Sequence, residues 1–401
     1  MSKSAAHLTL KDRPLPKKAA RGGEAAASRR LSILFLTTVL PGEGRAGGEI
    51  VSAHVIEALR TLGHDVRVLG YARTGYVPGA GEMLVETRAI ETRGAAFSAV
   101  RWLAQAFARR TPYSAEKYVG GSYLATLEQA LSERRWDRVI LDHAQMGWLL
   151  PRLDGQDLIH VSHNCEGLLY AGQARHGNVF RRAIFTREAR MMEEVERRLA
   201  LRARSVWTLT EAQAHVFREM GASSVTVLPV PPMPLADSFR LPEPDCDIAL
   251  LGTWSWGPNR AGLDWFCQEV VPLAPSLRIR VGGTGAEDLR GRFEGIEIAG
   301  RVPDAAAFLA SARVIAVPST AGDGIQIKSL DAIAIGRPVV ATPFALRGID
   351  GLPPRVKSAE TPRAFAAALR EALEQSTGDA ADDWQAKRRE TFRGVLESAL
   401  A

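Results

Sequence analysis

The feature that most constrains the fold is the alternation of short apolar segments with amphipathic ones. An apolar run at 31–40 is followed by a glycine-rich stretch at 41–49, a segment with helical spacing at 50–65 and a second apolar run at 65–71. Continuous apolar runs of this length are typical of parallel strands that are buried on both faces. Together these segments predict one βαβ unit of a doubly wound sheet.

The same alternation continues on either side of a proline-rich segment, which we interpret as a linker. We predict further strands at 138–144, 158–164, the start of 205–222, 225–230, 246–254, 277–283, 296–302, 313–319 and 337–343, and long helices at 182–203 and 382–401. Two βα-repeating halves predict an α/β protein with two Rossmann-like, doubly wound domains that face each other across a cleft. The predicted segments are a leader at 1–30, a first domain at 31–229, the linker at 230–245, a second domain at 246–380 and a final helix at 381–401.

The net charge of +6 is concentrated at the start of the chain. Residues 1–30 contain eight Lys or Arg and two acidic residues, so the rest of the chain is balanced. Because the body lacks a basic field, we expect no nucleic-acid partner. The composition of the leader is typical of disorder. Contact with anionic lipid and simple solvation are the two interpretations of its charge.

Composition also indicates the cellular compartment in which the protein is expected to work. Cys165, Cys246 and Cys267 have no spacing typical of a metal or redox site, which indicates a reducing compartment. No apolar run approaches the roughly 20 residues of a membrane-spanning helix, and the N-terminus lacks the apolar core of a secretory signal. We therefore expect a cytoplasmic protein without a bound metal. Association with the cytoplasmic face of a membrane is a further alternative.

The stretch GDGIQIKSLDAIAIGRPVVAT, residues 322–342, has the features of an anion site. Gly322 and Gly324 let the backbone approach a ligand, and the first N–H groups of the helix that follows favour an anion. Lys328 adds a charge that reaches phosphate, and Asp331, on the same face, is suited to ribose hydroxyls. This arrangement fits a nucleoside diphosphate. The alternative is a solvated i,i+3 pair of Lys328 and Asp331 on an outer helix.

A second loop is expected at the same sheet edge. In LLGTWSWGPNRAGLDWF, residues 250–266, a strand leads into Gly252 and Thr253 and then into a helix that begins near Asn259. Ligands of open α/β sheets bind outside the carboxyl ends of the strands. We therefore include these residues, with Gly324 and Ile325, among the candidates for donor binding.

Several blocks of the sequence together resemble glycosyltransferase family 4. They are GGEIVSAHVIEALRTLGHDVRVL in the first half, and GTWSWGPNRAGLDWFCQEVVP, VGGTGAEDLR, GRVPDAAAFLASARVIAVPS and GIQIKSLDAIAIGRPVVAT in the second. The likeness is greatest to bacterial members that build exopolysaccharide or other surface glycans. It implies the GT-B fold, in which two Rossmann-like domains bind acceptor and nucleotide sugar and the last helix crosses back to the first domain.

The resemblance implies hexosyl transfer with retention and without an obligatory metal. Gly47 and Gly48 would lie beside the donor phosphates and the acceptor. Lys328 would neutralise the leaving diphosphate, and the carboxylate at position 331 would hold the donor ribose. The donor would be a UDP- or GDP-sugar, and the acceptor a glycan or a lipid-linked sugar.

The sequence departs from the family at two places. Asp323 and Asp331 stand where the family commonly has two glutamates, and we retain Asp323 as a catalytic candidate. The Gly-Arg…Lys-Gly phosphate loop of the family is absent, and Thr253 to Arg260 occupies its place. Arg260 is the candidate for the missing cation.

The first half contributes candidates after two predicted strands. The resemblance implies that His163, in HVSHNCEG, contacts the transferred sugar, while a structural hydrogen-bonding role is the alternative. Asn164 follows it on the acceptor side. Asp142 and His143 end another strand and are acceptor-side candidates, with capping of the next helix as the alternative.

One helix offers a surface feature. Residues 94–134 are predicted to be largely helical, and the stretch with Trp102, Phe107, Arg109 and Arg110 is basic on one face and apolar on the other. It either packs on its own domain or contacts a membrane or a lipid-linked acceptor.

We therefore expect a retaining glycosyltransferase. A nucleotide-sugar 2-epimerase and a non-catalytic partner that binds nucleotide sugar are the alternatives. A nicotinamide dehydrogenase is disfavoured because neither half has a tight G-x-G-x-x-G after its first strand.

Overall fold

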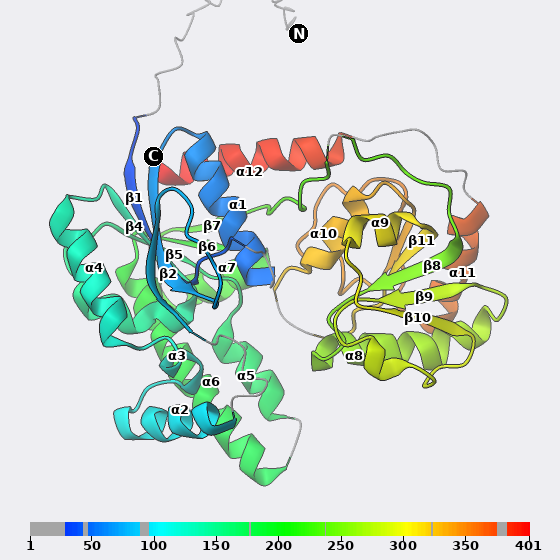
Figure 1. Ribbon diagram of the computed structural model, residues 1–401, viewed down its shortest axis with the longest axis horizontal. Helices are drawn as coiled ribbons and strands as arrows, with labels where there is room; N and C mark the ends of the chain where they lie inside the picture. The colour runs from blue at the N-terminus through cyan, green and yellow to red at the C-terminus, as the bar shows by residue number, and fades with distance from the viewer. Residues whose placement is uncertain are drawn as a thin grey trace, which may run out of the picture. The chain divides into compact units, whose positions relative to one another are not determined.

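The structure, a computed structural model, describes residues 29–42, 47–88, 96–175, 178–236, 238–321, 324–374 and 383–401. Its body contains two parallel sheets, one in each half of the chain (Figure 1). The first has the order β3-β2-β1-β4-β5-β6-β7 and the second β10-β9-β8-β11-β12-β13. The predicted fold class, two Rossmann-like α/β domains, is confirmed.

The first sheet is formed by strands that alternate with helices. The strands are β1 (Ser32–Val39), β2 (Asp65–Ala72), β3 (Glu82–Thr87), β4 (Arg138–Asp142), β5 (Leu158–Val161), β6 (Ser205–Thr208) and β7 (Val225–Val227). The helices are α1 (Gly47–Thr61), α2 (Ala96–Arg109), α3 (Tyr113–Glu116), α4 (Gly121–Glu133), a 3₁₀ segment (Ala144–Arg152), α5 (Glu166–Ala174), α6 (Val179–Arg202) and α7 (Glu211–Glu219).

The second sheet follows a stretch that holds neither helix nor strand among its described residues between Val227 and Cys246. Its strands are β8 (Cys246–Leu251), β9 (Ile279–Gly282), β10 (Ile296–Gly300), β11 (Ala312–Val317), β12 (Val339–Ala341) and β13 (Val356–Ser358). The main helices are α8 (Gly257–Trp265), α9 (Ala305–Ala310), α10 (Ile327–Ala334), α11 (Pro362–Glu374) and α12 (Trp384–Leu400).

Each sheet is buried on both faces because alternate strand residues point to opposite helix layers. In β8, Ile248 and Leu250 join the cluster under α8 and α11, while Ala249 joins the cluster under α9 and α10. In β1, Leu34 and Phe35 divide in the same way between the two faces. This is why the strands appear in the sequence as continuous apolar runs.

Three details differ from the expected elements. Strands β3 and β13 were not predicted. Both lie at an edge of their sheet, and most of their side chains are half-exposed. Helix α1 begins at Gly47, not at residue 50, so Gly47 and Gly48 form its first turn.

The last helix crosses to the first domain, as expected. Helix α12, red in Figure 1, packs on α1 through Phe392, Leu396 and Leu400, which belong to the same buried cluster as the apolar face of α1. Arg138 of β4 donates to the carbonyl of Leu400, and Arg388 donates to the carbonyl of Val230. Each large apolar side chain buried this way contributes about 1.5–3 kcal/mol.

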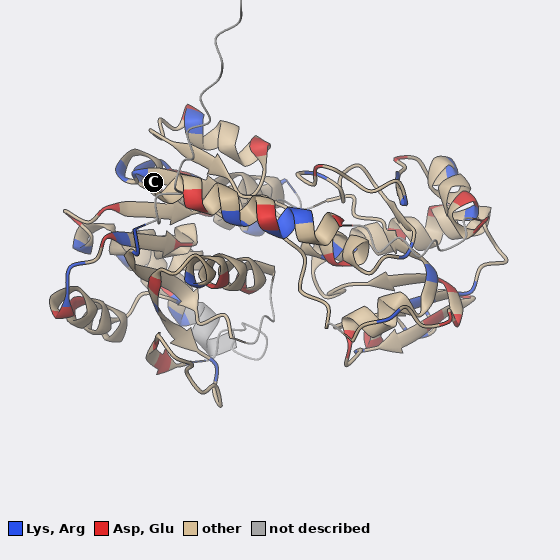
Figure 2. Cartoon of the chain, turned by 90° about the horizontal axis from the view of Figure 1, so that it is seen from above, with Lys and Arg blue, Asp and Glu red and all other residues tan. Residues whose placement is uncertain are grey.

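Charges outside the leader are mixed. Figure 2 shows Lys and Arg interspersed with Asp and Glu over the helices of both domains, in line with the balanced charge of the body. The three cysteines are buried, and no disulfide joins any two of them. Among the described helices, none is both long and apolar enough to cross a membrane. The leader, apart from Arg29 and Arg30, lies outside the described residues.

Helix α6 organises two shorter helices through buried carboxylates. Glu188 accepts hydrogen bonds from the N–H groups of Tyr113 and Ser114, both at 2.8 Å, at the start of α3. Glu196, fully buried, accepts from the N–H groups of Glu166 at 2.6 Å and Gly167 at 3.0 Å at the start of α5. These side chains satisfy helix N–H groups that have no partner within their own helices.

We predict that Glu196→Ala lowers the free energy of unfolding by about 2–3 kcal/mol, because two buried N–H groups lose a charged acceptor. Denaturant unfolding followed by circular dichroism measures this loss. The matched control is Glu193→Ala, an exposed glutamate on the same helix, which should change stability by less than about 0.5 kcal/mol. Equal effects of the two substitutions would contradict the capping role of Glu196.

Candidate functional site

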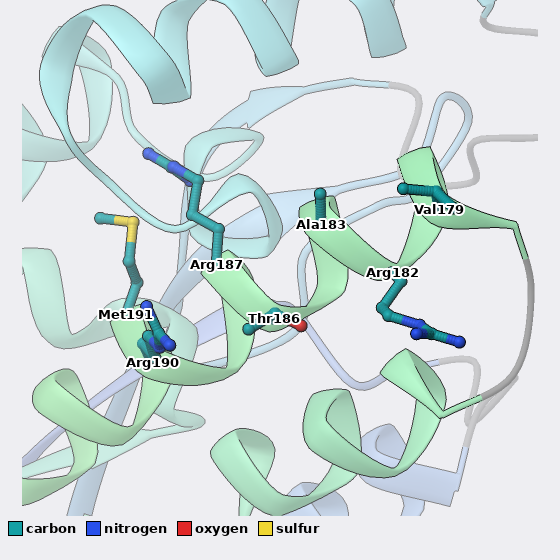
Figure 3. Close-up of a pocket in the computed structure, with 7 residues that line it drawn as sticks. All are labelled: Val179, Arg182, Ala183, Thr186, Arg187, Arg190 and Met191. Carbon is teal, nitrogen blue, oxygen red and sulfur yellow. The ribbon is translucent and has the colours of Figure 1, made fainter.

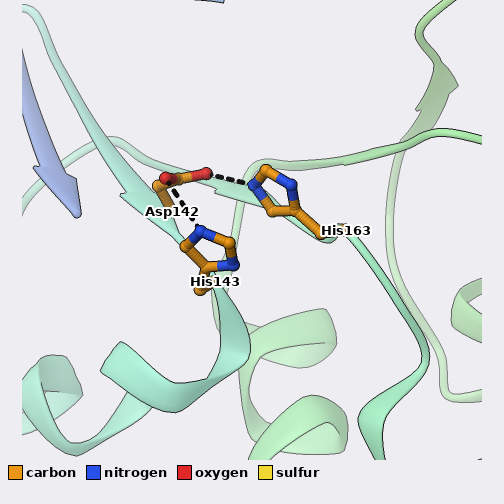
Figure 4. A group of neighbouring side chains, drawn as sticks. All are labelled: Asp142, His143 and His163. Carbon is orange, nitrogen blue, oxygen red and sulfur yellow. Dashed lines mark hydrogen bonds and ion pairs between the residues drawn. The ribbon is translucent and has the colours of Figure 1, made fainter. Parts of the chain in front are cut away.

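Both sheets reverse their strand order at one point, between β1 and β4 and between β8 and β11. In doubly wound sheets the crevice at this point is the usual ligand site. At the reversal point of the first sheet, the structure brings together Gly48 of α1, Asp142 and His143 at the end of β4, and His163 after β5. Figure 4 shows the Asp142, His143 and His163 side chains pointing toward one another.

Asp142 is the centre of this group. Its side chain is fully buried, and it accepts from the hydroxyls of Thr37 at 2.8 Å and Ser52 at 2.7 Å and from His163 Nε2 at 2.6 Å. Burial by itself would raise the pKa of Asp142, but the adjacent imidazoles of His143 and His163 and the hydrogen bonds hold that pKa well below its usual range. Asp142 is therefore ionised at neutral pH.

His143 is held close to both groups. Its ring stacks on that of His163 with centroids 3.9 Å apart, and its Nε2 lies 3.5 Å from Asp142 Oδ2. Burial lowers the pKa of His143 to about 3, so its ring is neutral at pH 7. Its backbone has φ of 70°, a strained conformation for a residue with a side chain.

The alternative that Asp142 or His143 caps the next helix is wrong for His143. His143 precedes the 3₁₀ segment Ala144–Arg152, but its side chain makes no capping hydrogen bond. The Asp142 carboxylate is instead satisfied from other elements of the same domain. Its partners belong to β1, α1 and the loop after β5.

The orientation of His163 follows from its partner. An ionised carboxylate can only accept, so Nε2 of His163 carries the hydrogen and donates it to Asp142. The Gln213 amide fixes the backbone of His163 by donating to its carbonyl at 3.1 Å. The other ring nitrogen, Nδ1, is buried and has no partner among the described residues. A Cβ placed on Gly48 would lie 3.7 Å from this nitrogen, so glycine keeps the approach to it open.

The same three side chains are close enough to suggest a metal site, since their donor atoms lie within 4.8 Å of one another. Their geometry fits a metal poorly. The lone pairs of stacked imidazoles lie in nearly parallel ring planes, 17° apart, so they do not converge on one ion. Asp142 is also already satisfied by two hydroxyls and His163. The arrangement suits a hydrogen-bonded group that orients His163.

At the reversal point of the second sheet, the loop after β8 is fixed by Trp254. Its buried ring donates from Nε1 to the carbonyl of Gly282 at 2.8 Å. A Cβ on Gly252 would lie 3.1 Å from that ring. The Asn259 amide donates to the carbonyl of Thr253 at 3.1 Å. The predicted residues Gly252, Thr253 and Asn259 therefore form one ordered turn.

Lys328 of α10 joins this turn from the neighbouring strand. Its Nζ donates to Asn259 Oδ1 at 2.7 Å, which links the helices that follow β8 and β11. Burial lowers the pKa of Lys328 to about 8. No carboxylate forms an ion pair with Lys328 among the residues that the structure describes. The alternative of a solvated Lys328–Asp331 pair is therefore wrong.

The first turn of α10 has no side-chain cap. Gln326 at its N-cap makes no side-chain capping bond, so the first N–H groups of the helix have no side-chain cap. Gly324 has φ of +69°, and Arg347 donates to its carbonyl at 3.0 Å. The side chain of Ile325 is buried. Asp323, the catalytic candidate, and Gly322 lie outside the described residues.

Two candidates have partners that the sequence did not predict. Asp331 Oδ1 accepts from the N–H of Met233 in the linker at 3.0 Å, and burial raises the pKa of Asp331 to about 6. It lies on the wall of an apolar cavity of about 400 Å³ beside Lys328. Arg260 is paired with Asp264, four residues later in α8, at 3.0 Å. Its charge is thus partly neutralised within its own helix.

Residues of the two reversal points lie near each other. A Cβ on Gly324 would lie 2.7 Å from Asn164 Oδ1 and 2.9 Å from the carbonyl of His163. A Cβ on Gly47 would lie 3.6 Å from Ile327 at the start of α10. Sequence reasoning missed Thr37, Ser52 and Gln213, because hydroxyl and amide side chains carry no functional signal until the fold places them around Asp142 and His163.

We predict that Gly48→Ala lowers the free energy of unfolding by about 1–3 kcal/mol, because the new Cβ would lie 2.9 Å from His143 Cε1. Gly47→Ala is the control. Its Cβ meets only an ordinary contact at 3.6 Å, so stability should stay unchanged or rise by up to about 1 kcal/mol. Denaturant unfolding compares the two variants, and equal stability would contradict the close packing of His143 on Gly48.

Comparisons with known proteins agree with this architecture. A family model described as "Glycosyl transferase 4-like domain" matches residues 46–232, and one described as "Glycosyl transferases group 1" matches residues 246–375. A search of curated protein sequences gives no match. The two family models together cover most of the chain. The first matches the half that contains the first sheet, and the second matches the half that contains the second sheet.

Solved structures share the fold over nearly the whole chain. Sucrose-phosphate synthase from Thermosynechococcus elongatus has 16% identity and a TM-score of 0.58, over 92% of this chain and 94% of that chain. WaaG, a glycosyltransferase involved in lipopolysaccharide biosynthesis, has 18% identity and a TM-score of 0.57, over 92% and 98%. Anabaena HepE in complex with UDP and glucose has 14% identity and a TM-score of 0.55, over 92% and 99%. The chain belongs to the group 1, family-4-like glycosyltransferases and has the GT-B fold.

Proposed function

We propose that this glycosyltransferase moves a hexosyl group from a UDP- or GDP-sugar to a glycan or lipid-linked acceptor, with retention of anomeric configuration and without a metal. The main observation in support of a donor site is the environment of Lys328. A largely buried ammonium whose hydrogen-bond partner is a neutral amide is costly unless an anion completes the site. The uncapped start of α10 supplies N–H groups for the same anion.

A diphosphate leaving group suits these features. Negative charge grows on the diphosphate as the bond to the sugar breaks, and a fixed cation and helix N–H groups stabilise that charge without reorganisation. Removal of one such donor commonly costs about 3 kcal/mol of transition-state stabilisation. Asn259 orients the Lys328 ammonium, and we place Gly252, Thr253, Gly324 and Ile325 along the backbone that faces the donor.

The ribose role of Asp331 requires an exchange of partners. Its carboxylate is satisfied by the N–H of Met233, so a ribose hydroxyl would share or replace that hydrogen bond. The adjoining cavity of about 400 Å³ has room for a nucleoside. We propose Arg260 only as a secondary contribution, because Asp264 already pairs with it. Asp323 keeps its proposed catalytic role from the family resemblance.

The sugar and acceptor side belongs to the first domain. We propose that His163 meets the transferred sugar through Nδ1, the ring nitrogen that Asp142 leaves free. Gly47 and Gly48 would admit the sugar and the acceptor beside it, with His143 and Asn164 along the acceptor path. Asp142 is fully buried and engaged by Thr37 and Ser52, so it orients His163 and does not attack the sugar.

Among the structural neighbours, HepE supports a uridine nucleotide as the donor. HepE was solved with UDP-glucose, and WaaG acts in lipopolysaccharide biosynthesis. We therefore propose UDP as the first nucleotide to test and a surface glycan or its lipid-linked precursor as the acceptor class. The three cysteines form no disulfide with one another, which is compatible with the predicted cytoplasmic location.

We predict that Lys328→Ala lowers kcat by about a hundredfold or more, because the diphosphate loses its fixed cation. Steady-state kinetics with the best donor measures the effect. The control is Lys387→Ala, an exposed lysine of α12 beside Asp383, which should leave kcat within about twofold. Unchanged kcat in the Lys328 variant would remove the basis for the donor site.

We also predict that nucleoside-diphosphate affinity falls as the pH rises above about 8. In the free protein the pKa of Lys328 is about 8, and only its protonated form attracts the diphosphate. Kd should rise by up to about tenfold per pH unit above that value. Lys328→Gln, which has no charge to lose, should bind weakly and show a flat profile. Calorimetric titration gives both curves, and parallel slopes would contradict the assignment.

The donor proposal is tested by a thermal-shift panel of UDP, GDP, ADP, TDP and NAD, each with and without Mg²⁺. A ligand at about a hundred times its Kd stabilises by about 2.7 kcal/mol. Stabilisation by one nucleoside diphosphate alone, unchanged by Mg²⁺, is the expected result. A response that needs Mg²⁺ contradicts the metal-free proposal, and a response to NAD alone contradicts the donor class.

Product analysis then separates the remaining functions. With donor and acceptor, nuclear magnetic resonance of the product should show the anomeric configuration of the donor. An inverted product would instead make His163 Nδ1 a base that takes the acceptor proton. Conversion of the donor to an epimer without acceptor would indicate the epimerase. Tight binding without turnover of any donor would indicate the non-catalytic partner.

A further inference from the structure

Two backbone segments touch where residues of the two crevices meet. Gly324, before α10, has φ of +69°, and a Cβ on it would lie 2.9 Å from the carbonyl oxygen of His163 and 2.7 Å from Asn164 Oδ1. Glycine is the residue that combines this conformation with so close an approach. The loop that leads into α10 on the donor side therefore contacts the segment that carries the histidine on the sugar side.

Each of these two segments is fixed by a side chain that donates to its main-chain carbonyl. Gln213 of α7 donates to the carbonyl of His163 at 3.1 Å. Arg347, in the turn after β12, donates from Nη2 to the carbonyl of Gly324 at 3.0 Å. The two side chains therefore hold the backbone on both sides of the contact between Gly324 and His163.

The guanidinium of Arg347 is itself held in place. It lies 4.4 Å from the ring centre of Phe344, within the range of a cation–π contact. The turn that carries it packs on α7, since a Cβ on Gly348 would lie 2.7 Å from Cγ2 of Thr210, the N-cap of that helix. Arg347 is therefore a half-buried donor with a defined position.

The hydrogen bond to Gly324 sets the direction of the next N–H group along the chain. A trans peptide is planar, and its carbonyl and N–H point in opposite directions. The described part of the chain contains no cis peptide bond, so the N–H of Ile325 points away from the guanidinium of Arg347. Ile325 is buried, and its N–H donates to no group among the residues that the structure describes. An N–H group in this situation favours an acceptor from a ligand.

We propose that Arg347 is a positioning residue of the transfer reaction: by holding the carbonyl of Gly324, it directs the N–H of Ile325 toward the leaving diphosphate of the donor. This role rests on the proposed function, because it gives a direction to one of the N–H groups that would stabilise the diphosphate. Arg347 acts through the backbone and does not itself touch the donor. A donor group fixed in advance stabilises developing charge without reorganisation.

The first domain contains an arginine with similar contacts and a purely structural role. Arg187 of α6 is half-buried, and its guanidinium lies 4.4 Å from the ring centre of Phe107. It donates to the carbonyls of Ala106 at 2.9 Å and Thr111 at 3.2 Å, around the end of α2. In Figure 3, Arg187 leaves α6 on the side opposite to Arg182, among the residues that line a cavity of about 470 Å³. Neither carbonyl belongs to a candidate site residue, so Arg187 is the matched control.

The test compares Arg347→Met, which fills the space without a hydrogen-bond donor, with Arg347→Lys, which keeps a donor. Steady-state kinetics with the best donor sugar should show kcat at least about tenfold lower in Arg347→Met, because a misdirected N–H group no longer stabilises the diphosphate. Arg347→Lys should recover most of that loss. Arg187→Met should leave kcat within about twofold of the wild type, since its effect is confined to stability.

Nuclear magnetic resonance of protein with isotope-labelled isoleucine follows the peptide itself, and Ile325→Val identifies the Ile325 N–H signal. In the free protein this signal should move in Arg347→Met and stay near its wild-type position in Arg347→Lys and Arg187→Met. UDP, or GDP if the thermal-shift panel selects it, should shift the signal in the wild type and shift it less in Arg347→Met at saturation. A general loss of stability would not produce this pattern.

The results distinguish failure of this role from failure of the donor proposal. If the nucleoside diphosphate binds the wild type, but kcat and the Ile325 signal are unchanged in Arg347→Met, the role of Arg347 is overturned and the donor site stands. Equal losses of kcat in Arg347→Met and Arg187→Met would show a structural role alone. If neither UDP nor GDP binds the wild type, the donor proposal fails and the role of Arg347 fails with it. Circular dichroism checks folding, and Arg347→Gln, whose shorter side chain does not reach Gly324, replaces Arg347→Met if that variant is unfolded.

Discussion

In a parallel sheet every strand ends at the same edge, and this constraint sets the position of every candidate site residue that the structure describes. Where strand order reverses, the helices that follow adjacent strands depart to opposite faces and leave a crevice. The first sheet places Asp142 and Gly48 at that point, and the second places Asn259 and Lys328 there. Residues far apart in sequence become neighbours only because the strand order makes them so.

The charged side chains at the two crevices differ in how well their charge is compensated. In the first domain, the anion of Asp142 is satisfied by hydroxyls and by the imidazole of His163, so it serves as an internal support. In the second domain, the cation of Lys328 has a neutral amide as its partner. A satisfied charge stabilises an orientation, whereas a buried charge without a counterion favours binding of an anion. This asymmetry is the physical basis for assigning leaving-group stabilisation to the second domain and sugar positioning to the first.

Helix α6 combines internal and external roles. Its inward carboxylates, Glu188 and Glu196, hold the starts of α3 and α5, while its first turns present Val179, Phe180 and arginines outward. Because the glutamates face inward, they do not offset the arginines at the surface. The same residue pattern therefore orders the helical layer of the first domain and leaves basic and apolar side chains exposed at the start of α6.

Much of the architecture was determined by the sequence itself. Continuous apolar runs predicted the buried central strands, and Gly336, whose φ is +94°, follows the C-cap of α10 at a position where glycine commonly ends helices. The edge strands β3 and β13 were missed because strands with half-exposed side chains lack that signal. Glycines at 47 and 48 were assigned to a glycine-rich stretch before the helix, since glycine is unfavourable inside helices, yet they form the first turn of α1, where a Cβ on Gly48 would lie 2.9 Å from His143.

The candidate site, like the fold, was determined partly by the sequence and partly by the tertiary structure. Lys328 and His163 could be selected from the sequence because a cation after a glycine turn and a histidine at a strand end are local patterns. Only the tertiary structure decided their partners: Asn259 for Lys328, Asp142 for His163, and the linker N–H of Met233 for Asp331. Local sequence encodes backbone geometry and residue type, but hydrogen-bond partners 21, 69 and 98 residues apart depend on strand order and on how the helices pack.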